Sequence, residues 1–179
     1  FEGIPAGFTV LVFTGFMAAD LLERAYHQVR PMERRAGAAR EILRQSREEL
    51  LARLEERSRS LTVGGALLEV ASGKLFGVTA LLEVACRRFS AARSERRVPT
   101  VLVTGEIYNR LDPFANDFVV DKLAERGIGV QVAPFTEWIE YTGCINIKNG
   151  GIALGNRLSG AVRKRIQDLL YRAASASLL

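Results

Sequence analysis

The stretch that decides the fold class covers residues 99–141 and reads PTVLVTGEIYNRLDPFANDFVVDKLAERGIGVQVAPFTEWIEY. It opens on a short apolar run at residues 101–103, which is β-branched at both ends. A second apolar run follows at residues 130–135. Continuous apolar runs of this kind are typical of strands that are buried on both faces, as in a parallel sheet. We therefore expect two strands of one parallel sheet.

A helix is expected between these two strands, after a loop at residues 106–112. Asp112 followed by Pro113 is a helix-start signal, because the carboxylate accepts hydrogen bonds from free backbone N–H groups and proline is tolerated at the first helical position. Asn116 is an alternative start, and Gly127 can end the helix in a left-handed conformation. A strand–helix–strand unit of this length predicts a right-handed βαβ crossover. The expected fold is therefore α/β, with a flavodoxin-like three-layer α/β/α arrangement around a short parallel sheet.

The candidate site lies in the loops that follow the two strands. In open parallel sheets, ligands bind beyond the carboxyl ends of the strands. A carboxylate, a phenol and a guanidinium at this edge could carry acid–base or anion-binding chemistry. The alternative is that Glu106 and Arg110 only pair with each other or cap nearby backbone. The candidate residues are Gly105, Glu106, Tyr108, Asn109, Arg110, Asn116 and Glu137.

The first of these loops carries a longer motif, GEIY-x-R-x-x-PFAN, at residues 105–116. Upstream, residues 18–37 read AADLLERAYHQVRPMERRAG, which is close to D-L-L followed by R-P-aromatic-E, with Met32 at the aromatic position. In these segments the chain resembles the C-terminal region of the 2-hydroxyacyl-CoA dehydratase-like proteins. More narrowly, it resembles the CoA-substrate-specific enzyme activase, or acyl-CoA dehydratase activase-related, proteins. The matching residues of the first motif are Gly105, Glu106, Ile107, Tyr108, Arg110, Pro113, Phe114, Ala115 and Asn116.

This resemblance implies a role in a larger system. The parent proteins would couple ATP hydrolysis to low-potential electron transfer through iron–sulfur clusters. The resemblance implies a cluster in the full-length protein and none in this segment alone, which would be a cytoplasmic scaffold without activity of its own. Its expected partners are the remainder of the parent chain and a second copy of itself, and neither nucleic acid nor a membrane. The chain begins with Phe1 rather than methionine, which agrees with a piece of a longer protein.

The two cysteines, Cys86 and Cys144, lie far apart and form no C-x-x-C pair, so the local spacing of a zinc or ferredoxin-type site is missing. Cys86 lies on the apolar side of an expected helix, and we interpret it as a core thiol. Cys144 lies in a loop-like, glycine-rich segment and is the candidate metal ligand. Two thiolates hold a four-iron cluster only if further cysteines come from the rest of the parent or from a second copy.

The net charge is +5, with 21 arginines against 4 lysines. A basic chain can bind nucleic acid or an anionic ligand such as coenzyme A. Here the arginines alternate with glutamates over residues 30–59, which is more simply a solvated helix face. No nucleic-acid-binding motif is present, and neither a G-x-G-x-x-G fingerprint nor a Walker-type phosphate loop is found. The arginine bias also points to a GC-rich bacterial genome.

The residues before the decisive stretch favour helices. Apolar positions at helical spacing predict helices over residues 18–29, 36–59 and 66–89, the last interrupted at Ser72–Gly73. Arg30–Pro31 should end the first of them. Residues 8–13 fit a strand or a helix equally well. No run of eighteen purely apolar residues suggests a membrane span, and the apolar beginning lacks the basic region of a signal peptide.

The domain organisation follows from these elements. We expect residues 1–97 to form a largely helical portion and residues 98–179 an α/β portion, with a closing helix over residues 159–174 for which Ser159 is the candidate cap. His27, the single histidine, is interpreted as a surface or partly buried polar residue.

Three functions stay open. The first is the dehydratase-related scaffold, the second a small-ligand-binding α/β module without redox chemistry, and the third a subunit-assembly domain.

Overall fold

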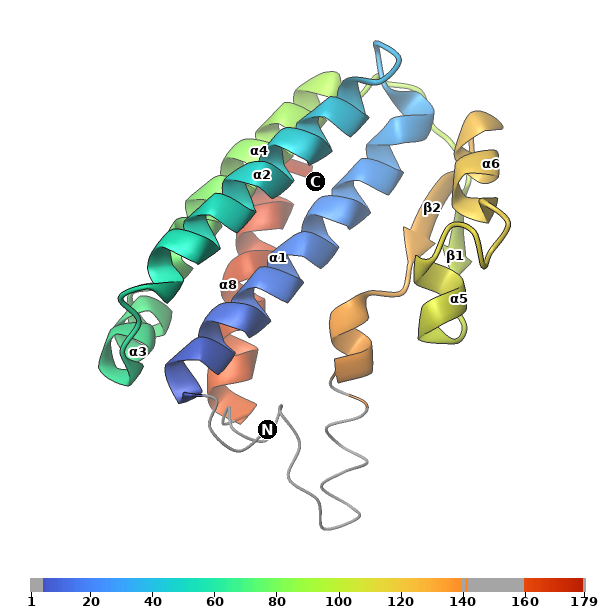
Figure 1. Cartoon of the computed structure of the whole chain (residues 1–179). Helices are drawn as coiled ribbons and strands as arrows, with labels where there is room; N and C mark the ends of the chain where they lie inside the picture. The colour runs from blue at the N-terminus through green and yellow to red at the C-terminus, as the bar shows by residue number, and fades with distance from the viewer. Residues whose placement is uncertain (1–4, 140, 142–159, 179) are drawn as a thin grey trace.

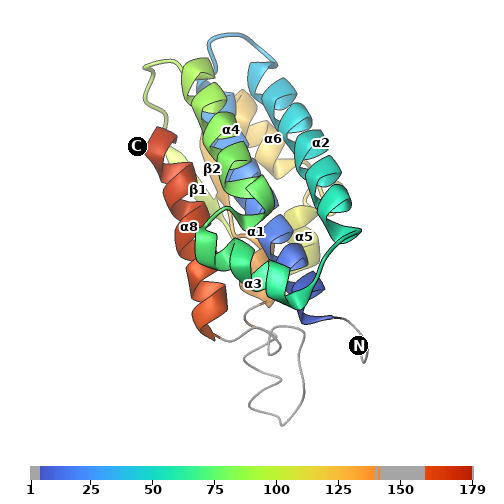
Figure 2. The same ribbon diagram turned by 90° about the vertical axis from the view of Figure 1, so that its left-hand side faces the viewer.

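α1 (Ala6–Val29) is the central helix of this computed structural model, which describes residues 5–139, 141 and 160–178. It packs on other helices along one side and on a strand along another. Figures 1 and 2 show a helical bundle, with a small unit of strands and short helices lying beside α1. The other elements are η1 (Arg30–Met32), α2 (Ala38–Ser58), α3 (Val63–Ser72), η2 (Leu75–Gly77), α4 (Val78–Ala92), β1 (Thr100–Val103), α5 (Ile107–Leu111), α6 (Val119–Glu125), β2 (Gly129–Val132) and α8 (Gly160–Leu178).

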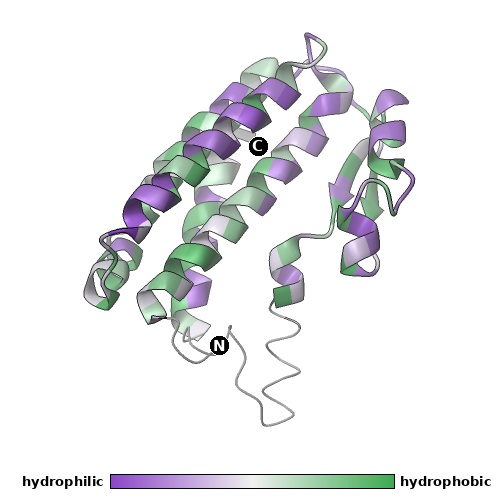
Figure 3. Cartoon of the chain, in the orientation of Figure 1, coloured by the Kyte–Doolittle hydropathy of each residue, from purple (hydrophilic) through white to green (hydrophobic). Residues whose placement is uncertain are grey.

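The beginning of α1 resolves the ambiguity of residues 8–13, which are helical. Val10, Leu11 and Phe13 are buried among the bundle helices, and this burial selects the helix that periodicity alone did not. Figure 3 shows this half of α1 as hydrophobic, whereas α2 is hydrophilic over much of its length. The predicted end at Arg30–Pro31 is confirmed, since the chain passes there into the 3₁₀ turn η1.

The bundle core is formed by apolar side chains of α1, α2, α4 and α8. Its fully buried members include Leu22, Leu82, Phe89, Ile166 and Leu170. α8, which belongs to the second portion expected from the sequence, packs on α4 of the first. The last helix therefore contributes to the helical core rather than only to the sheet.

The helices expected at residues 36–59 and 66–89 are confirmed with small shifts of their ends. The break at Ser72–Gly73 is present, and Gly73 ends α3 in the left-handed conformation at φ +76°. Two apolar positions differ from the expectation, because Leu51 is 67% exposed and Leu67 is 51% exposed. Neither is covered by another described element, so both lie on outer helix faces.

β1 and β2 form a two-stranded parallel sheet, in which Thr100 is opposite Gly129 and Val103 is opposite Val132. The mixed α/β class is thus confirmed in its coarse form, although the described residues are mostly helical. The expectation that the first strand is buried on both faces is wrong, since most of β1 is exposed in this structure. The reason is that α1 packs on β2 and no described helix covers β1 to the same extent.

The segment between the strands differs from the prediction in its details. Residues 107–111, expected as loop, form the short helix α5. The Asp112 carboxylate accepts hydrogen bonds from the N–H groups of Phe114 and Ala115, as a cap does, but no helix follows directly, because Asp117 and Phe118 have positive φ and the segment forms turns. Helix α6 begins only at Val119, whose N–H donates to Asn116 Oδ1, so the alternative start is the nearer one.

The ends of the second half are partly as expected. Gly127 has φ +73° and follows α6, which confirms the left-handed stop. The second strand was expected over residues 130–135, but β2 ends at Val132 and a short helical segment starts at Phe135. Cys144, the glycine-rich segment around it and Ser159 lie outside the described residues.

The segment Ala6–Met32 is long and apolar enough to cross a membrane, by length and composition. In this structure 61% of its most apolar window is buried against the rest of the chain, as in the core helix of a bundle. The bent pair α3 and α4 passes the same test only if its two helices are joined into one span.

Candidate functional site

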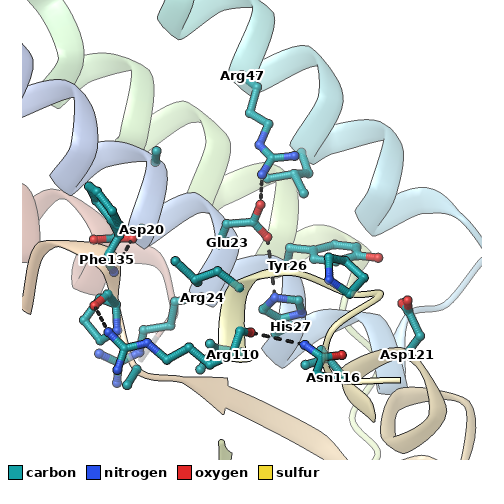
Figure 4. Close-up of a pocket in the computed structure, with 18 of the residues that line it drawn as sticks. Asp20, Glu23, Arg24, Tyr26, His27, Arg47, Arg110, Asn116, Asp121 and Phe135 are labelled. Carbon is teal, nitrogen blue, oxygen red and sulfur yellow. Dashed lines mark hydrogen bonds and ion pairs between the residues drawn. The ribbon is translucent and has the colours of Figure 1, made fainter. Parts of the chain in front are cut away.

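A cleft of about 720 Å³ lies between the polar side of α1 and the segment that runs from α5 to the end of β2. Its lining includes residues that follow the carboxyl ends of both parallel strands, which is where the sheet geometry places ligand sites. Figure 4 shows side chains of α1 on one side of the cleft and those of residues 110–116 on the other. The polar side chains of its lining are those of Asp20, Glu23, Arg24, His27, Arg40, Arg47, Arg110, Asn116 and Asp121.

Asp20 joins α1 to the segment after β2. Its two carboxylate oxygens accept hydrogen bonds from the N–H groups of Phe135, at 3.0 Å, and Thr136, at 2.9 Å. The hydroxyl of Thr136, a residue that is almost fully buried, donates to the same carboxylate at 2.6 Å. Asp20 therefore caps the helical segment that starts at Phe135, from a position 115 residues earlier in the chain.

Glu23, one turn further along α1, holds two groups at once. It forms an ion pair with Arg47 of α2, and its other carboxylate oxygen lies 3.5 Å from Nε2 of His27. Burial, followed by the nearby charge of Arg30, lowers the pKa of His27 to about 4. The ring is therefore neutral at pH 7. Its buried Nδ1 has no hydrogen-bond partner among the described residues.

Arg30 lies at the carboxyl end of α1, beyond Asp20 and Glu23. Its guanidinium pairs with Asp121 of α6 and lies 5.8 Å from the ring centroid of Tyr26. This ion pair fastens the end of α1 to the helix between the two strands. Together with the Asp20 cap, it fixes the small α/β unit beside the bundle at two points.

Arg110 connects the ends of the two strands. Its Nη1 donates to the carbonyl of Gly105, which follows β1, at 3.3 Å, and its Nη2 donates to the carbonyl of Pro134, which follows β2, at 3.1 Å. Asn116 donates from Nδ2 to the carbonyl of Arg110 at 3.4 Å. Nε of Arg110 is buried without a partner in the part of the chain that the structure describes. The guanidinium is thus held in place by carbonyls rather than by a carboxylate.

The other candidate residues of this loop do not line the cleft. Glu106 accepts hydrogen bonds from the N–H groups of Tyr108, at 2.8 Å, and Asn109, at 3.2 Å, and so caps α5. The side chain of Tyr108 is 66% exposed, and Glu137 is exposed as well. Gly105 has φ +142°, a conformation that favours glycine, and nothing lies within 4 Å of the position a Cβ would take.

The cysteines are separated from this site. Cys86 is fully buried in the bundle core, and burial raises the pKa of its thiol to about 11. It is therefore a thiol of the hydrophobic core, as the sequence indicated. Within the ranges 5–139, 141 and 160–178, no group of three histidine, cysteine, aspartate or glutamate side chains is arranged to hold a metal ion.

Sequence reasoning identified one wall of the cleft and missed the other. Arg110 and Asn116 were among the candidate residues, but Asp20 and Glu23 were not, and His27 was interpreted as an ordinary polar residue. The available signal was their spacing of three and four residues, which puts all three on one side of a helix whose other sides are apolar.

Comparison of the chain with models of protein families, with curated proteins and with solved structures finds no match. The function is therefore argued from the contacts above and from the resemblance carried by residues 18–37 and 105–116.

Proposed function

We propose that this chain is a scaffold domain of a protein related to the 2-hydroxyacyl-CoA dehydratases and to the CoA-substrate-specific enzyme activases. In this role it belongs to a cytoplasmic, ATP-driven system of low-potential iron–sulfur electron transfer and has no activity by itself. The rest of the parent chain is its first partner.

The observation that carries this proposal is what the resembling residues do. Glu106 caps α5, Arg110 ties together the ends of the two strands, and Asn116 bonds both to the carbonyl of Arg110 and to the N–H that starts α6. These side chains make their hydrogen bonds to backbone groups, those of their own loop and, for Arg110, also the carbonyl of Pro134 after β2. A motif whose side chains bond to the backbone keeps the loop in one conformation, which is what a scaffold requires.

The surface beside this loop supports the same role. Leu102 on β1 is 63% exposed and Phe114 is 85% exposed, next to the exposed Tyr108. Parallel sheets are normally covered on both faces, and a two-stranded sheet is marginal alone. We propose that further strands and helices of the parent cover this surface and complete a flavodoxin-like three-layer sheet.

The iron–sulfur cluster of the proposed system would be held outside the described residues. Cys86 does not fit as a ligand, because it is fully buried in the apolar bundle core and belongs to no group of three metal-binding side chains among the described residues. No chemical step is therefore assigned to a cluster on the described part of this chain.

The test is the iron and acid-labile sulfide content of the chain after purification without oxygen. The Cys144→Ser and Cys86→Ser variants are measured beside it. The proposal expects no stoichiometric iron in any of the three proteins. Stoichiometric iron that is lost in Cys144→Ser and kept in Cys86→Ser would show that this segment supplies cluster ligands, and the scaffold role would then be wrong.

The small-ligand-binding module is favoured as a second candidate by one observation, the cleft of about 720 Å³ at the carboxyl ends of the strands. Small-molecule sites typically have volumes of roughly 300–1,000 Å³. A saturable response to a small molecule in a chain without iron would favour this candidate over the redox scaffold.

A further inference from the structure

We propose that the cleft binds an organic anion, a carboxylate or phosphate ester with an apolar body, through the guanidinium groups of Arg24, Arg40 and Arg110. This inference goes beyond the scaffold role and does not depend on it. It rests on the arginine side chains of the cleft that have no carboxylate partner among the described residues.

The carboxylates of the cleft are all in use. Asp20 accepts three hydrogen bonds from Phe135 and Thr136, and Glu23 is shared between Arg47 and His27. Asp121 is paired with Arg30, whose side chain is largely buried. Glu23 and Asp121 are thus each neutralised by an arginine, whereas Asp20, whose partners are all uncharged, keeps its negative charge.

The arginines of the cleft are not all neutralised. Arg47 is paired with Glu23, whereas Arg24, Arg40 and Arg110 have no carboxylate within ion-pair distance in the described part of the chain. Arg24 and Arg40 are exposed on α1 and α2. These three unpaired guanidinium groups outnumber the single un-neutralised carboxylate, Asp20, so the cleft carries an excess of positive charge that a bound anion would reduce.

The guanidinium group of Arg110 is held in a fixed orientation. Two of its five N–H groups are held by the carbonyls of Gly105 and Pro134, so the planar guanidinium needs no ordering when a ligand arrives. Its buried Nε has no described partner. A guanidinium with free N–H donors can bind two oxygens of one carboxylate or phosphate, which is the strongest form of anion recognition available to a side chain.

The remaining wall is apolar. Phe16 of α1 is 39% exposed and lies 5.0 Å, between ring centroids, from Phe135. Leu111 and Phe118, from the opposite segment, are 43% and 47% exposed. His27 adds no charge at neutral pH. A ligand that fills the cleft would therefore bring an aliphatic or aromatic body as well as an anionic group.

Calorimetric titration of the chain with phenyl phosphate, benzoate and the uncharged benzyl alcohol tests the proposal. We expect one of the two anions to bind with a 1:1 stoichiometry and benzyl alcohol to bind at least tenfold more weakly. Tighter binding of phenyl phosphate would identify a phosphate ester as the ligand class, and tighter binding of benzoate a carboxylic acid.

Arg24→Gln and Arg40→Gln should each weaken the anion that binds by roughly three- to tenfold, the range expected for one charged contact. Arg57→Gln is the matched control, because Arg57 is also an exposed arginine of α2 but does not line the cleft. Circular dichroism should show that all three variants keep the wild-type fold.

Two results would overturn the proposal. One is the absence of saturable binding for both anions. The other is an equal loss of affinity in Arg57→Gln, which would show that only the overall charge of the chain attracts the anion. Neither result bears on the iron content of the chain, so failure here leaves the scaffold role standing.

Discussion

Replacing Asp20 by alanine should loosen the small α/β unit from the bundle. Asp20 caps the helical segment at Phe135 and accepts the hydroxyl of the buried Thr136. Loss of an N-cap side chain costs about 0.5–2 kcal/mol. Leaving a buried hydroxyl without its acceptor costs about 1–3 kcal/mol. Water from the adjacent cleft can replace part of these contacts, so we expect the variant to lose about 2–3 kcal/mol of its free energy of unfolding.

The fluorescence of Trp138 can report on the segment that Asp20 caps. It is the single tryptophan of the chain, lies in the capped segment, and has its ring 5.7 Å from that of Phe135, between centroids. Urea unfolding can be followed by its fluorescence and, in parallel, by circular dichroism of the helices. The fluorescence transition should shift to lower urea in Asp20→Ala by at least as much as the transition of the helices.

Two further variants define the size of the effect. Asp20→Asn keeps one acceptor oxygen without the charge and should lose about 1 kcal/mol. Asp168→Ala is the matched control, because Asp168 is an exposed aspartate of α8 with no hydrogen-bond or ion-pair partner among the described residues. A loss below about 0.5 kcal/mol in Asp20→Ala, or an equal loss in Asp168→Ala, would refute the assignment of Asp20 as a cap.

Three other predictions concern the core and the turns. Because the pKa of His27 is about 4 in the folded chain, the unfolded chain alone binds this proton as the pH falls below about 6.5, so stability decreases. Between pH 6.5 and 5, urea unfolding of the wild type should lose about 1.5 kcal/mol more than that of His27→Gln. Gly77 has φ +79°, so Gly77→Ala should lower stability by about 1 kcal/mol, whereas Gly64→Ala, inside α3 with open space around it, should raise it by about 0.5 kcal/mol in thermal unfolding. In a Cys144→Ser background, iodoacetamide should label Cys86 only after denaturant is added, and rapid labelling of the native chain would contradict its burial.

Local signals predicted the helices of this chain well. The mixture of leucine, arginine and glutamate in α2, the proline after Arg30 and the glycine at position 127 each act through contacts within a few residues. The parallel pairing of the two strands was predicted for the same reason, because a helix of this length between two strands leaves few alternatives.

The same signals failed where burial depends on distant partners. Residues 101–103 were expected inside a covered sheet because they are apolar, yet most of β1 is exposed. Leu51 and Leu67 fit helical stripes but point away from the core. The apolar character of a side chain indicates how much free energy its burial would contribute. It does not indicate whether another helix or strand is present to cover it.

The candidate site shows the same division. Its loop wall, with Arg110 and Asn116, follows from the rule that ligands bind beyond the ends of parallel strands. Its helix wall depends on contacts such as that between Asp20 and Phe135, which are 115 residues apart. A capping carboxylate is normally next to the helix that it caps, and a search of neighbouring residues does not find this one.

Local sequence signals predicted most of the helices, several of the stops between them, the strand–helix–strand order and the loop that carries the GEIY motif, but left residues 8–13 open and missed α5. These features depend on backbone hydrogen bonds and side-chain propensities that act within about one or two helical turns. Three further features come from tertiary packing: α8 packs on α4, β1 stays exposed, and the polar side of α1 faces Arg110. These outcomes depend on which apolar faces bury one another, and that choice is made by the packing of the whole chain.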